Sequence, residues 1–462
     1  MKRYVLLLAM LATLTGYCQW SFVGSSDGFA PDGAITPVLR FHPQTNEPYV
    51  FFFDFLQNVG AGPTLMRFDG SDWVDLGGRR FDDDDPNLTP FKIGFDFDRT
   101  NNWPVVYYDS PPNHMQTFDG IDWIEYVGDD TIQIQDFFIN GDGFGFAVNP
   151  LNGNPTLAFS DTSNGGTPGL ASVVSYGPTN WGYLSTPKFS QEVAAFFDME
   201  YYASNGAPYL LHDGGTGDRV VVSEFDGVEW NDLPDPNLTN QNNSIAKIRI
   251  DQSNGDIYVA NPANIGGQPT IEVKKWDGST WTDLVTDVTQ VHAQATAFDF
   301  GINPGDGMVY LLYMDRNNTS SNPNLTVSRY DGSDWVMLGN ETISGGSDHI
   351  SLAFHPVDFV PYVAYGAASG SGGWVKRFDG TLGVNDPSLA QLEIRLTPNP
   401  AINYTKITGM LVDQYEVYDL NGRRLLAGYG NQVNTESLSA GTYLVKVVST
   451  SGQPNHTKLI VK

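Results

Sequence analysis

Short apolar segments alternate with polar turns along most of the chain, and the same order of segments recurs. An apolar run, a polar turn and a second apolar run that opens on proline follow one another at residues 39–41 and 48–53, and again at residues 350–354 and 361–365. Short runs rich in β-branched and aromatic residues, bounded by turn residues, are typical of β-strands. The pattern therefore predicts an all-β protein built from repeated strand pairs.

A short phrase marks each repeat: an aromatic residue, Asp-Gly, two further residues and Trp. Complete copies begin at Phe68, Phe118, Phe225, Trp276 and Tyr330, a degenerate copy begins at Tyr176, and a copy without its Trp begins at Phe378. The spacing between copies runs from 48 residues (330 to 378) to 58 residues (118 to 176). Because Asp-Gly favours tight hairpins, the phrase predicts two paired strands joined by a tight turn.

Each repeat thus holds four strands, two from the apolar pair and two from the aromatic phrase. Four antiparallel strands in a repeat of this length are typical of a propeller blade. Seven copies of the phrase predict a seven-bladed β-propeller over residues 19–386.

The N-terminal end of this region supplies the strand that the last repeat lacks. Trp20 and Gly24 have the same spacing as Trp73 and Gly77 in the first repeat. We therefore expect residues 19–24 to form the outer strand of the last blade and to close the ring, which leaves no exposed sheet edge between the ends.

The C-terminal segment, residues 391–462, has a different pattern. It contains no Trp, and the aromatic-Asp-Gly phrase stops before it. Short strands rich in β-branched residues are expected at residues 404–407, 414–418, 442–448 and 456–461.

Four stretches of this segment, at residues 396–400, 417–425, 438–446 and 458–462, resemble the type A C-terminal sorting domain of the type IX secretion system. The residues that carry the sorting signal in this resemblance are Pro398, Asn399, Pro400, Gly422, Gly441 and Lys462.

The resemblance implies a small immunoglobulin-like β-sandwich at residues 396–462, joined to the propeller by a linker at residues 387–395. It also implies recognition by the type IX secretion machinery, with removal of the domain on export and a cargo that is released or held at the cell surface. The alternative is an accessory β-sandwich that binds a ligand.

The N-terminus is typical of a secretory signal peptide. Two basic residues precede an apolar run at residues 4–14, which is shorter than the ~20 residues of a membrane span. Gly16 and Cys18 are small residues at the right spacing for cleavage before Gln19, so residues 1–18 are expected to be removed. The alternative, lipidation of Cys18, is disfavoured by the bulky tyrosine before it. No later segment is long and apolar enough to predict a transmembrane span.

Composition narrows the function classes. The chain has 25 Lys and Arg against 53 Asp and Glu, a formal net charge of −28. This balance excludes sequence-independent binding to nucleic acid or to an anionic membrane, both of which need a basic surface. A single cysteine excludes an intrachain disulfide framework and a Cys-ligated zinc site.

Loop variation indicates which face of the predicted propeller carries function. The turns between the first and second strands and between the third and fourth strands share one face, the turn face, and are short and repetitive. The loops between the second and third strands, together with those that join repeats, share the opposite face, the loop face. The loops between the second and third strands differ in every repeat. Variable loops on a rigid scaffold commonly carry binding sites.

Carboxylates gather on the loop face. Five of its loops open with aspartate, at Asp54, Asp109, Asp161, Asp213 and Asp315, and an acidic run lies in another of its loops, at Asp82, Asp83, Asp84 and Asp85. An oxygen-rich face suits a hard cation such as calcium, or a basic partner. The alternative is that each aspartate caps its own strand end through a local Asx turn.

A few non-repeating side chains are candidates for chemistry or stacking. His114, His212 and Tyr201 would be the proton-transfer groups of a lyase, and Trp103 and Trp374 would be sugar-stacking platforms because they lie outside the repeated Trp position. The sequence carries no metalloprotease, nucleophile-elbow or P-loop motif.

The leading hypothesis is a secreted or surface-displayed, non-catalytic propeller that binds a glycan, matrix or another surface protein. The alternative is an enzyme, a propeller polysaccharide lyase or glycoside hydrolase, whose non-repeating side chains would have to converge in one pocket. A third hypothesis is a structural role in a surface assembly, such as adhesion in motility.

Overall fold

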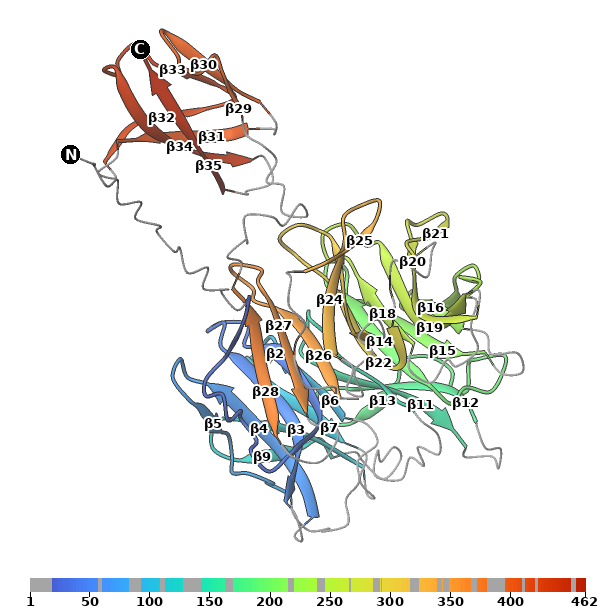
Figure 1. Ribbon diagram of the computed structural model, residues 1–462. Helices are drawn as coiled ribbons and strands as arrows, with labels where there is room; N and C mark the ends of the chain where they lie inside the picture. The colour runs from blue at the N-terminus through green and yellow to red at the C-terminus, as the bar shows by residue number, and fades with distance from the viewer. Residues whose placement is uncertain are drawn as a thin grey trace, which may run out of the picture. The chain divides into compact units, whose positions relative to one another are not determined.

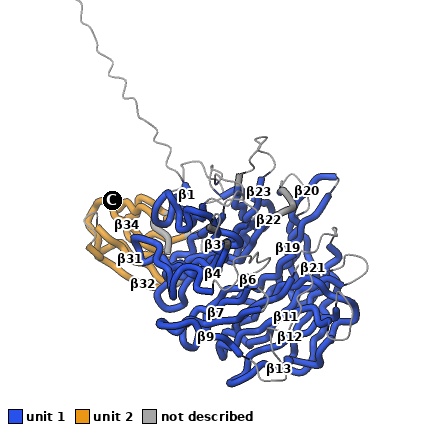
Figure 2. Tube along the Cα trace, turned by 90° about the horizontal axis from the view of Figure 1, so that it is seen from below, with its two compact units in different colours: residues 1–383 blue, residues 384–462 orange. Residues whose placement is uncertain are grey.

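A computed structural model of the chain describes residues 19–56, 60–82, 93–108, 113–127, 143–162, 169–214, 220–238, 246–265, 267–285, 291, 293–315, 324–338, 343, 349–366, 372–379, 395–408, 412–419, 423–449 and 454–462. The chain divides into two compact units, residues 1–383 and 384–462 (Figure 2). The expected signal peptide lies outside the described residues.

The described strands of the first unit form seven four-stranded antiparallel sheets (Figure 1). The first four sheets are β2 (Ala34–Phe41), β3 (Pro48–Leu56), β4 (Gly60–Phe68) and β5 (Trp73–Asp75); β6 (Ile93–Asp98), β7 (Trp103–Tyr108), β8 (His114–Phe118) and β9 (Trp123–Glu125); β10 (Gly145–Val148), β11 (Pro155–Asp161), β12 (Leu170–Tyr176) and β13 (Trp181–Tyr183); and β14 (Phe197–Tyr202), β15 (Ala207–Asp213), β16 (Val220–Phe225) and β17 (Trp230–Asp232). The last three are β18 (Lys247–Ile250), β19 (Ile257–Ile265), β20 (Gln268–Trp276) and β21 (Trp281–Asp283); β22 (Ala293–Ile302), β23 (Val309–Asp315), β24 (Asn324–Tyr330) and β25 (Trp335–Met337); and β26 (Ile350–Phe354), β27 (Pro361–Gly366), β28 (Gly373–Phe378) and β1 (Trp20–Phe22).

The first strands of successive sheets contact one another around a closed circuit. β2 contacts β6, and the contacts continue through β10, β14, β18, β22 and β26 back to β2. In the last sheet the fourth strand comes from the other end of the unit, because β1 pairs with β28. In this pairing Trp20 lies opposite Phe378, and Phe22 lies opposite Lys376.

The second strand of each sheet is apolar on both faces because it lies between two neighbouring sheets. In β3, Val50 and Phe52 belong to the core cluster that contains Val375 of β28, whereas Phe51 and Phe53 belong to a cluster formed with the β6 sheet. All four β3 side chains are fully buried. Successive side chains of a strand point to opposite faces, so an unbroken apolar run is what a strand between two sheets requires.

The Asp-Gly phrase forms a wider turn than the tight hairpin expected from the sequence. Phe68 pairs with Trp73, which leaves four residues in the turn, Asp69 to Asp72. The Asp69 carboxylate accepts hydrogen bonds of 2.9 Å from the N–H groups of both Ser71 and Asp72. These bonds lower the pKa of Asp69 to about 2. Together with the backbone bond from the Asp69 N–H to the Asp72 carbonyl, at 3.1 Å, they close the four-residue turn.

The tryptophan that begins a fourth strand joins its sheet to the preceding sheet. The four indole N–H groups for which the structure gives this bond donate to a backbone carbonyl just after the preceding fourth strand: Trp73 to Val23 at 2.8 Å, Trp181 to Tyr126 at 3.1 Å, Trp281 to Pro234 at 2.7 Å, and Trp335 to Leu284 at 2.9 Å. The repeated phrase is therefore a link between neighbouring repeats as well as a hairpin.

The second unit holds two sheets around one core. Its three-stranded sheet is β29 (Arg395–Thr397), β30 (Tyr404–Thr408) and β33 (Gln432–Asn434), and its four-stranded sheet is β32 (Arg424–Tyr429), β31 (Val412–Tyr418), β34 (Gly441–Ser449) and β35 (Pro454–Val461). Ile407 and Val433 of the first sheet share a core cluster with Val417 and Val445 of the second.

The four strands expected in this unit are present, and β29, β32 and β33 were not expected. The Asn399 side chain, in the proposed sorting signal, bridges to the last strand: its Nδ2 donates to the Lys458 carbonyl at 2.8 Å, and its Oδ1 accepts from the Ile460 N–H at 2.8 Å.

Candidate functional site

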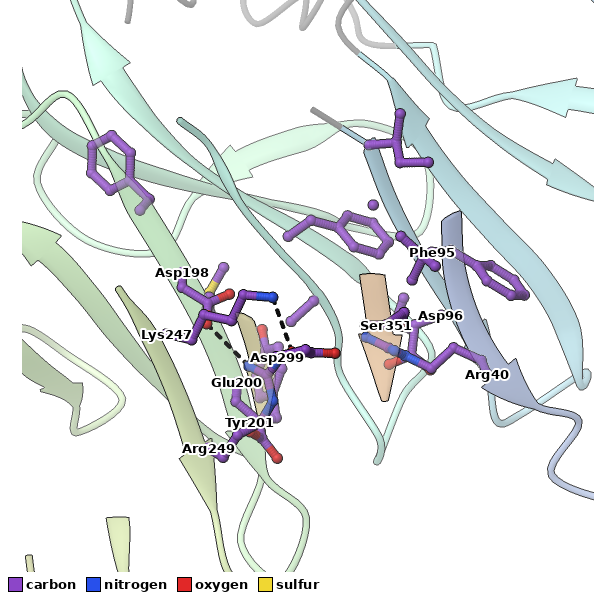
Figure 3. A pocket seen from close by; sticks show the side chains of 18 of the residues that line it. Arg40, Phe95, Asp96, Asp198, Glu200, Tyr201, Lys247, Arg249, Asp299 and Ser351 are labelled. Atoms are coloured by element: carbon purple, nitrogen blue, oxygen red, sulfur yellow. Dashed lines mark hydrogen bonds and ion pairs between the residues drawn. The ribbon is translucent and has the colours of Figure 1, made fainter. Parts of the chain in front are cut away.

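The first strands of the seven sheets line a cavity of about 670 Å³ (Figure 3). All seven strands contribute lining residues, from β2 around the circuit to β26. Small-molecule sites commonly have volumes in this range, so the cavity is the candidate site in the described part of the chain.

Strand register arranges residues of the first strands in two layers around the cavity, and all but Gly145, Gly301 and Ala353 line it. The second strands share an equivalent position at or next to their first residue, at Pro48, Pro104, Pro155, Pro208, Ile257, Val309 and Pro361. The turn layer pairs with the second position counted from these residues and consists of Arg40, Asp96, Ala147, Glu200, Arg249, Gly301 and Ala353. The middle layer pairs with the fourth position and consists of Val38, Gly94, Gly145, Asp198, Lys247, Asp299 and Ser351.

Charge is concentrated where β14, β18 and β22 meet. The Arg249 guanidinium contacts Asp198 at 3.0 Å through Nη1 and Asp299 at 3.2 Å through Nη2. Lys247 Nζ lies 2.9 Å from the same Asp299 carboxylate. Figure 3 shows these side chains as one cluster on one side of the cavity.

The polar side chains of both layers also join neighbouring sheets through backbone hydrogen bonds. Each acceptor takes an N–H from the first strand of the next sheet: Asp198 from Ile248 at 2.9 Å, Glu200 from Ile250 at 3.1 Å, Asp299 from Leu352 at 2.8 Å, and Ser351 Oγ from Leu39 at 3.1 Å. The carboxylates of the cavity therefore hold the circuit together.

The two most perturbed carboxyl groups of the cavity differ in the sign of their shifts. Burial raises the pKa of Glu200 to about 7, and the nearby Arg249 offsets only part of that effect. Asp299 is also buried, which by itself would raise its pKa, but Lys247 and Arg249 hold the pKa of Asp299 below its ordinary value. The cavity thus holds both a carboxyl group that titrates near neutral pH and one that stays ionised.

Three of the loop-face aspartates lie at or near the ends of their second strands and have partners within their own repeat. Asp54 is buried and receives two hydrogen bonds from Arg79, at 2.7 and 2.8 Å. Asp161 accepts from Ser172 at 3.0 Å. Asp213 accepts from the N–H groups of Ala195 at 2.7 Å and Phe196 at 2.9 Å.

Two further acidic candidates, Asp315 and Asp82, lie within the described residues. Asp315 is the last residue of β23. The Asp82 carboxylate accepts a hydrogen bond of 2.5 Å from the Tyr108 hydroxyl. Asp109, Asp83, Asp84 and Asp85 lie outside the described residues, as does Gly422 of the sorting signal.

The structure does not bring the three proton-transfer candidates together. His212 pairs with Phe197 and Tyr201 pairs with Pro208, so the two side chains lie at opposite ends of the β14–β15 pair, roughly 13 Å apart along the strand. His114 belongs to a different sheet.

Each of these three side chains has its own neighbours. His114 Nδ1 lies 3.7 Å from Asp82 and 3.6 Å from Glu125. His212 Nδ1 lies 2.7 Å from the Asp213 carbonyl oxygen. The Tyr201 hydroxyl lies 2.7 Å from Thr156 Oγ1, and burial raises the pKa of Tyr201 to about 12.

The two candidate stacking tryptophans occupy different surroundings. Trp103 is 36% exposed and begins β7, at the end of that strand next to the turn face. Trp374 is the second residue of β28, at the end of that strand next to the loop face. Its ring stacks on Tyr365 with ring centroids 5.5 Å apart, and its Nε1 donates to the Ser26 carbonyl at 3.1 Å. Neither residue lines the cavity.

Within the described ranges, no group of three or more His, Cys, Asp or Glu side chains is arranged to hold a metal ion. The same part of the chain has no helix whose length and apolar character would let it cross a membrane.

Reasoning from loop variation did not identify the cavity cluster, although the sequence carries a signal for it. The segments at residues 197–201 and 246–250 alternate charged and apolar residues within strands that must also pack against their neighbours. Charges at alternate positions of an otherwise buried first strand indicate a polar channel.

Comparison with known proteins supports the assignment of the C-terminal unit. Residues 395–462 match the family described as a secretion system C-terminal sorting domain. The match supports the expected type IX sorting domain and, with it, export to the cell surface or the surroundings of the cell. A comparison with curated proteins found no match.

Solved structures to which the chain is similar at low identity include a lectin and a polysaccharide lyase. The extracellular domain of the hybrid two-component system BT3049 from B. thetaiotaomicron has 11% identity and a TM-score of 0.46 over 96% of this chain, which spans 57% of that one. The SapL1 lectin, in complex with alpha methyl fucoside, has 14% identity and a TM-score of 0.40 over 70% of this chain and 99% of its own. The polysaccharide lyase Uly1 has 9% identity and a TM-score of 0.45 over 80% of this chain and 94% of its own. At these scores none of the likenesses assigns a ligand or an activity to this chain.

Proposed function

We propose that this protein is an exported, non-catalytic β-propeller that binds an extracellular glycan, matrix component or surface protein. In this proposal the seven sheets are the blades, residues 19–24 close the ring, and the C-terminal unit is an immunoglobulin-like β-sandwich read by the type IX machinery. The closed circuit of first-strand contacts and the pairing of β1 with β28 support the ring.

The separation of the ionisable candidates carries the non-catalytic assignment. General acid and base groups act within hydrogen-bond reach of one substrate position. Tyr201 and His212 lie at opposite ends of one strand pair, and His114 is in another sheet. The cavity carboxylates accept backbone hydrogen bonds from neighbouring sheets, which is a structural use of the same groups.

One observation favours the alternative, an enzyme that acts on extracellular polysaccharide. A carboxyl group with a pKa near 7 suits a general acid, and Glu200 has this property. However, one Glu200 oxygen accepts from the Ile250 N–H at 3.1 Å and the other from Gln252 Nε2 at 3.0 Å. Both oxygens are therefore engaged without a substrate.

Incubation of the chain from Gln19 with a panel of oligosaccharides distinguishes the two functions. Ligand-observed NMR reports binding, and reducing-end and unsaturated-product assays on the same samples report cleavage. We expect binding without product. Product formation by the native chain that disappears in Glu200→Gln would overturn the non-catalytic proposal in favour of the enzyme.

A further inference from the structure

Two arginines occupy equivalent positions in the cavity wall. Arg249 of β18 pairs with Tyr258, and Arg40 of β2 pairs with Tyr49, at the same position of the strand opening. Each guanidinium donates from Nη1 to the carbonyl of the preceding residue, at 2.6 Å in Arg249 and 2.9 Å in Arg40. The two arginines are therefore directly comparable in their backbone position and in this hydrogen bond.

The neighbours of the two arginines differ. Arg249 lies between Asp198 of the preceding sheet and Asp299 of the following sheet, and it binds both carboxylates. The two equivalent middle-layer positions around Arg40 are Ser351 and Gly94. Among the described residues Arg40 makes the one hydrogen bond to the Leu39 carbonyl and no ion pair.

Ser351 occupies the position equivalent to Asp198 in its own sheet. It makes the same backbone contact but carries no charge. Asp198 accepts the N–H of the residue before Arg249, and Ser351 accepts the N–H of the residue before Arg40. The serine therefore performs the structural task of the aspartate without pairing the arginine. The result is a guanidinium in the wall of the cavity with most of its donors unused.

The surroundings of Arg40 suit a ring that carries a carboxylate. The Phe146 ring lies over Gly94, where an added Cβ would come within 2.5 Å of it, and Phe146 lines the cavity. Across the cavity, Asp198 offers an acceptor for a hydroxyl group (Figure 3). A guanidinium fork matches a carboxylate in two-point geometry, and an aromatic face suits the apolar face of a sugar ring.

The balance of charge in the cavity limits the ligand to a single acidic group. Basic and acidic lining side chains are equal in number, with Arg40, Arg99, Lys247 and Arg249 against Asp96, Asp198, Glu200 and Asp299. The chain as a whole carries a net charge of −28, which disfavours a long polyanion. Asp96, the turn-layer residue of the sheet that follows Arg40, adds an acidic neighbour, so a ligand with one carboxylate is favoured over one with several.

We propose that Arg40 is the anion subsite of a saccharide site in this cavity, and that it takes the carboxylate of a uronic acid residue. The proposal deepens the binding function above and rests on it. Arg40 supplies the paired donors, Ser351 borders the same space, and Phe146 contacts the ring.

The first experiment compares methyl β-D-glucuronoside with methyl β-D-glucoside on the full chain from Gln19, by ligand-observed NMR and calorimetry. These probes differ at the carboxylate, so their affinity ratio measures the anion subsite. We expect the glucuronoside to bind at least about tenfold more tightly, because a charge-assisted bond has roughly this effect.

Two substitutions test the arginine from opposite directions. Arg40→Gln removes the guanidinium, and we expect glucuronoside affinity to fall about 10- to 100-fold while glucoside affinity is unchanged. Ser351→Asp keeps Arg40 but recreates the environment of Arg249, so an internal carboxylate should occupy the guanidinium and weaken glucuronoside binding to the same degree. Arg67→Gln, a change at an arginine paired with Glu47 outside the cavity, is the control and should leave both affinities unchanged.

The outcomes separate this inference from the function on which it rests. Equal binding of the two glycosides, or glucuronoside binding that Arg40→Gln and Ser351→Asp do not change in folded protein, overturns the subsite and leaves a binding function elsewhere. Conversion of an oligouronate to product overturns the non-catalytic function. In that case, loss of glucuronoside binding in Arg40→Gln and Ser351→Asp would still support the subsite. Preferential binding of peptides with a free C-terminus over the glucuronoside overturns the uronic acid assignment.

Discussion

The indole Nε1 of Trp73 donates a 2.8 Å hydrogen bond to the carbonyl oxygen of Val23, which lies 50 residues earlier in the chain. Val23 follows β1, the strand that completes the last sheet, whereas Trp73 begins the fourth strand of the first sheet. The bond therefore connects the two sheets that contain the ends of the circuit. Trp181, Trp281 and Trp335 make the equivalent bond between other neighbouring sheets.

Replacing Trp73 with Phe should lower the free energy of unfolding by about 1 kcal/mol more than the same change at Trp123. Both indoles pack against the aromatic residue of their phrase, with ring centroids 5.5 Å from Phe68 and 5.3 Å from Phe118. Trp123 Nε1, in contrast, has no hydrogen-bond partner among the described residues. Urea denaturation of both variants measures the difference, and equal losses would show that the bond to Val23 contributes nothing to stability.

The spacing from Trp to Gly in the repeats reflects a close contact between neighbours. Gly77 has a φ of +72°, and a Cβ there would lie 2.3 Å from Trp123 Nε1. Gly78 has a φ of +93°, and a Cβ there would meet nothing within 4 Å. Both positions disfavour a side chain through the backbone, but only Gly77 also faces a steric clash.

We therefore expect Gly77→Ala to destabilise the chain by about 1–3 kcal/mol more than Gly78→Ala, because overpacking adds to the backbone cost. Thermal unfolding of the two variants compares them under one condition. A larger loss at Gly78 would mean that backbone conformation, rather than contact with the next repeat, explains the glycine.

Glu200 should make stability depend on pH mainly between about 4.5 and 7. Its pKa is raised to about 7 in the folded chain, so the folded state holds a proton that the unfolded state releases at lower pH. This group therefore favours folding at low pH, and the contribution is lost as the pH rises through about 7. The change amounts to about 1–3 kcal/mol.

Glu200→Gln removes this proton, so its stability relative to the native chain should improve from pH 5 to pH 8. Asp69→Asn is the control, because a carboxyl group with a pKa of about 2 stays ionised throughout the range and its removal should cause no pH-dependent difference. Melting temperatures at the two pH values provide the measurement. The same pH dependence in Glu200→Gln as in the native chain would show that another group titrates.

Much of the strand pattern can be predicted from the sequence because repetition reinforces each local signal. The Trp of each complete phrase begins a fourth strand, and a second strand such as Pro361–Gly366 begins at its proline. The short strands β29 and β33 of the C-terminal unit carry no comparable signal, because each is three residues long. Their apolar residues, such as Leu396 and Val433, are recognisable only from the core that they share.

The cavity was harder to predict than the strands because its chemistry depends on distant pairs. The contacts of Arg249 with Asp198 and Asp299 join residues about fifty positions apart, and nothing local distinguishes Arg249 from Arg40. Likewise, the sequence predicts Asp54 at the opening of a loop but does not show its pairing with Arg79. Register between sheets, which the sequence does not show, decides which charges are neutralised.

We propose that residues 19–24 complete the last sheet and so close the ring around the cavity. Phe22 lies opposite Lys376, and Lys376 Nζ lies 4.5 Å from the centroid of the Phe22 ring, so the two side chains are neighbours. The only cysteine of the chain is Cys18, so a chain that begins at Gln19 contains no competing thiol.

The most direct measurement is therefore disulfide formation in Phe22→Cys/Lys376→Cys, read by intact mass and by mapping of the linked peptides under mild oxidation. We expect a rapid and nearly complete intramolecular disulfide that raises the melting temperature. The shifted pair Phe22→Cys/Arg377→Cys should link poorly, because side chains one residue out of register point to opposite faces. A reduced Phe22→Cys/Lys376→Cys chain, or equal linking of both pairs, would contradict closure of the ring by the first strand.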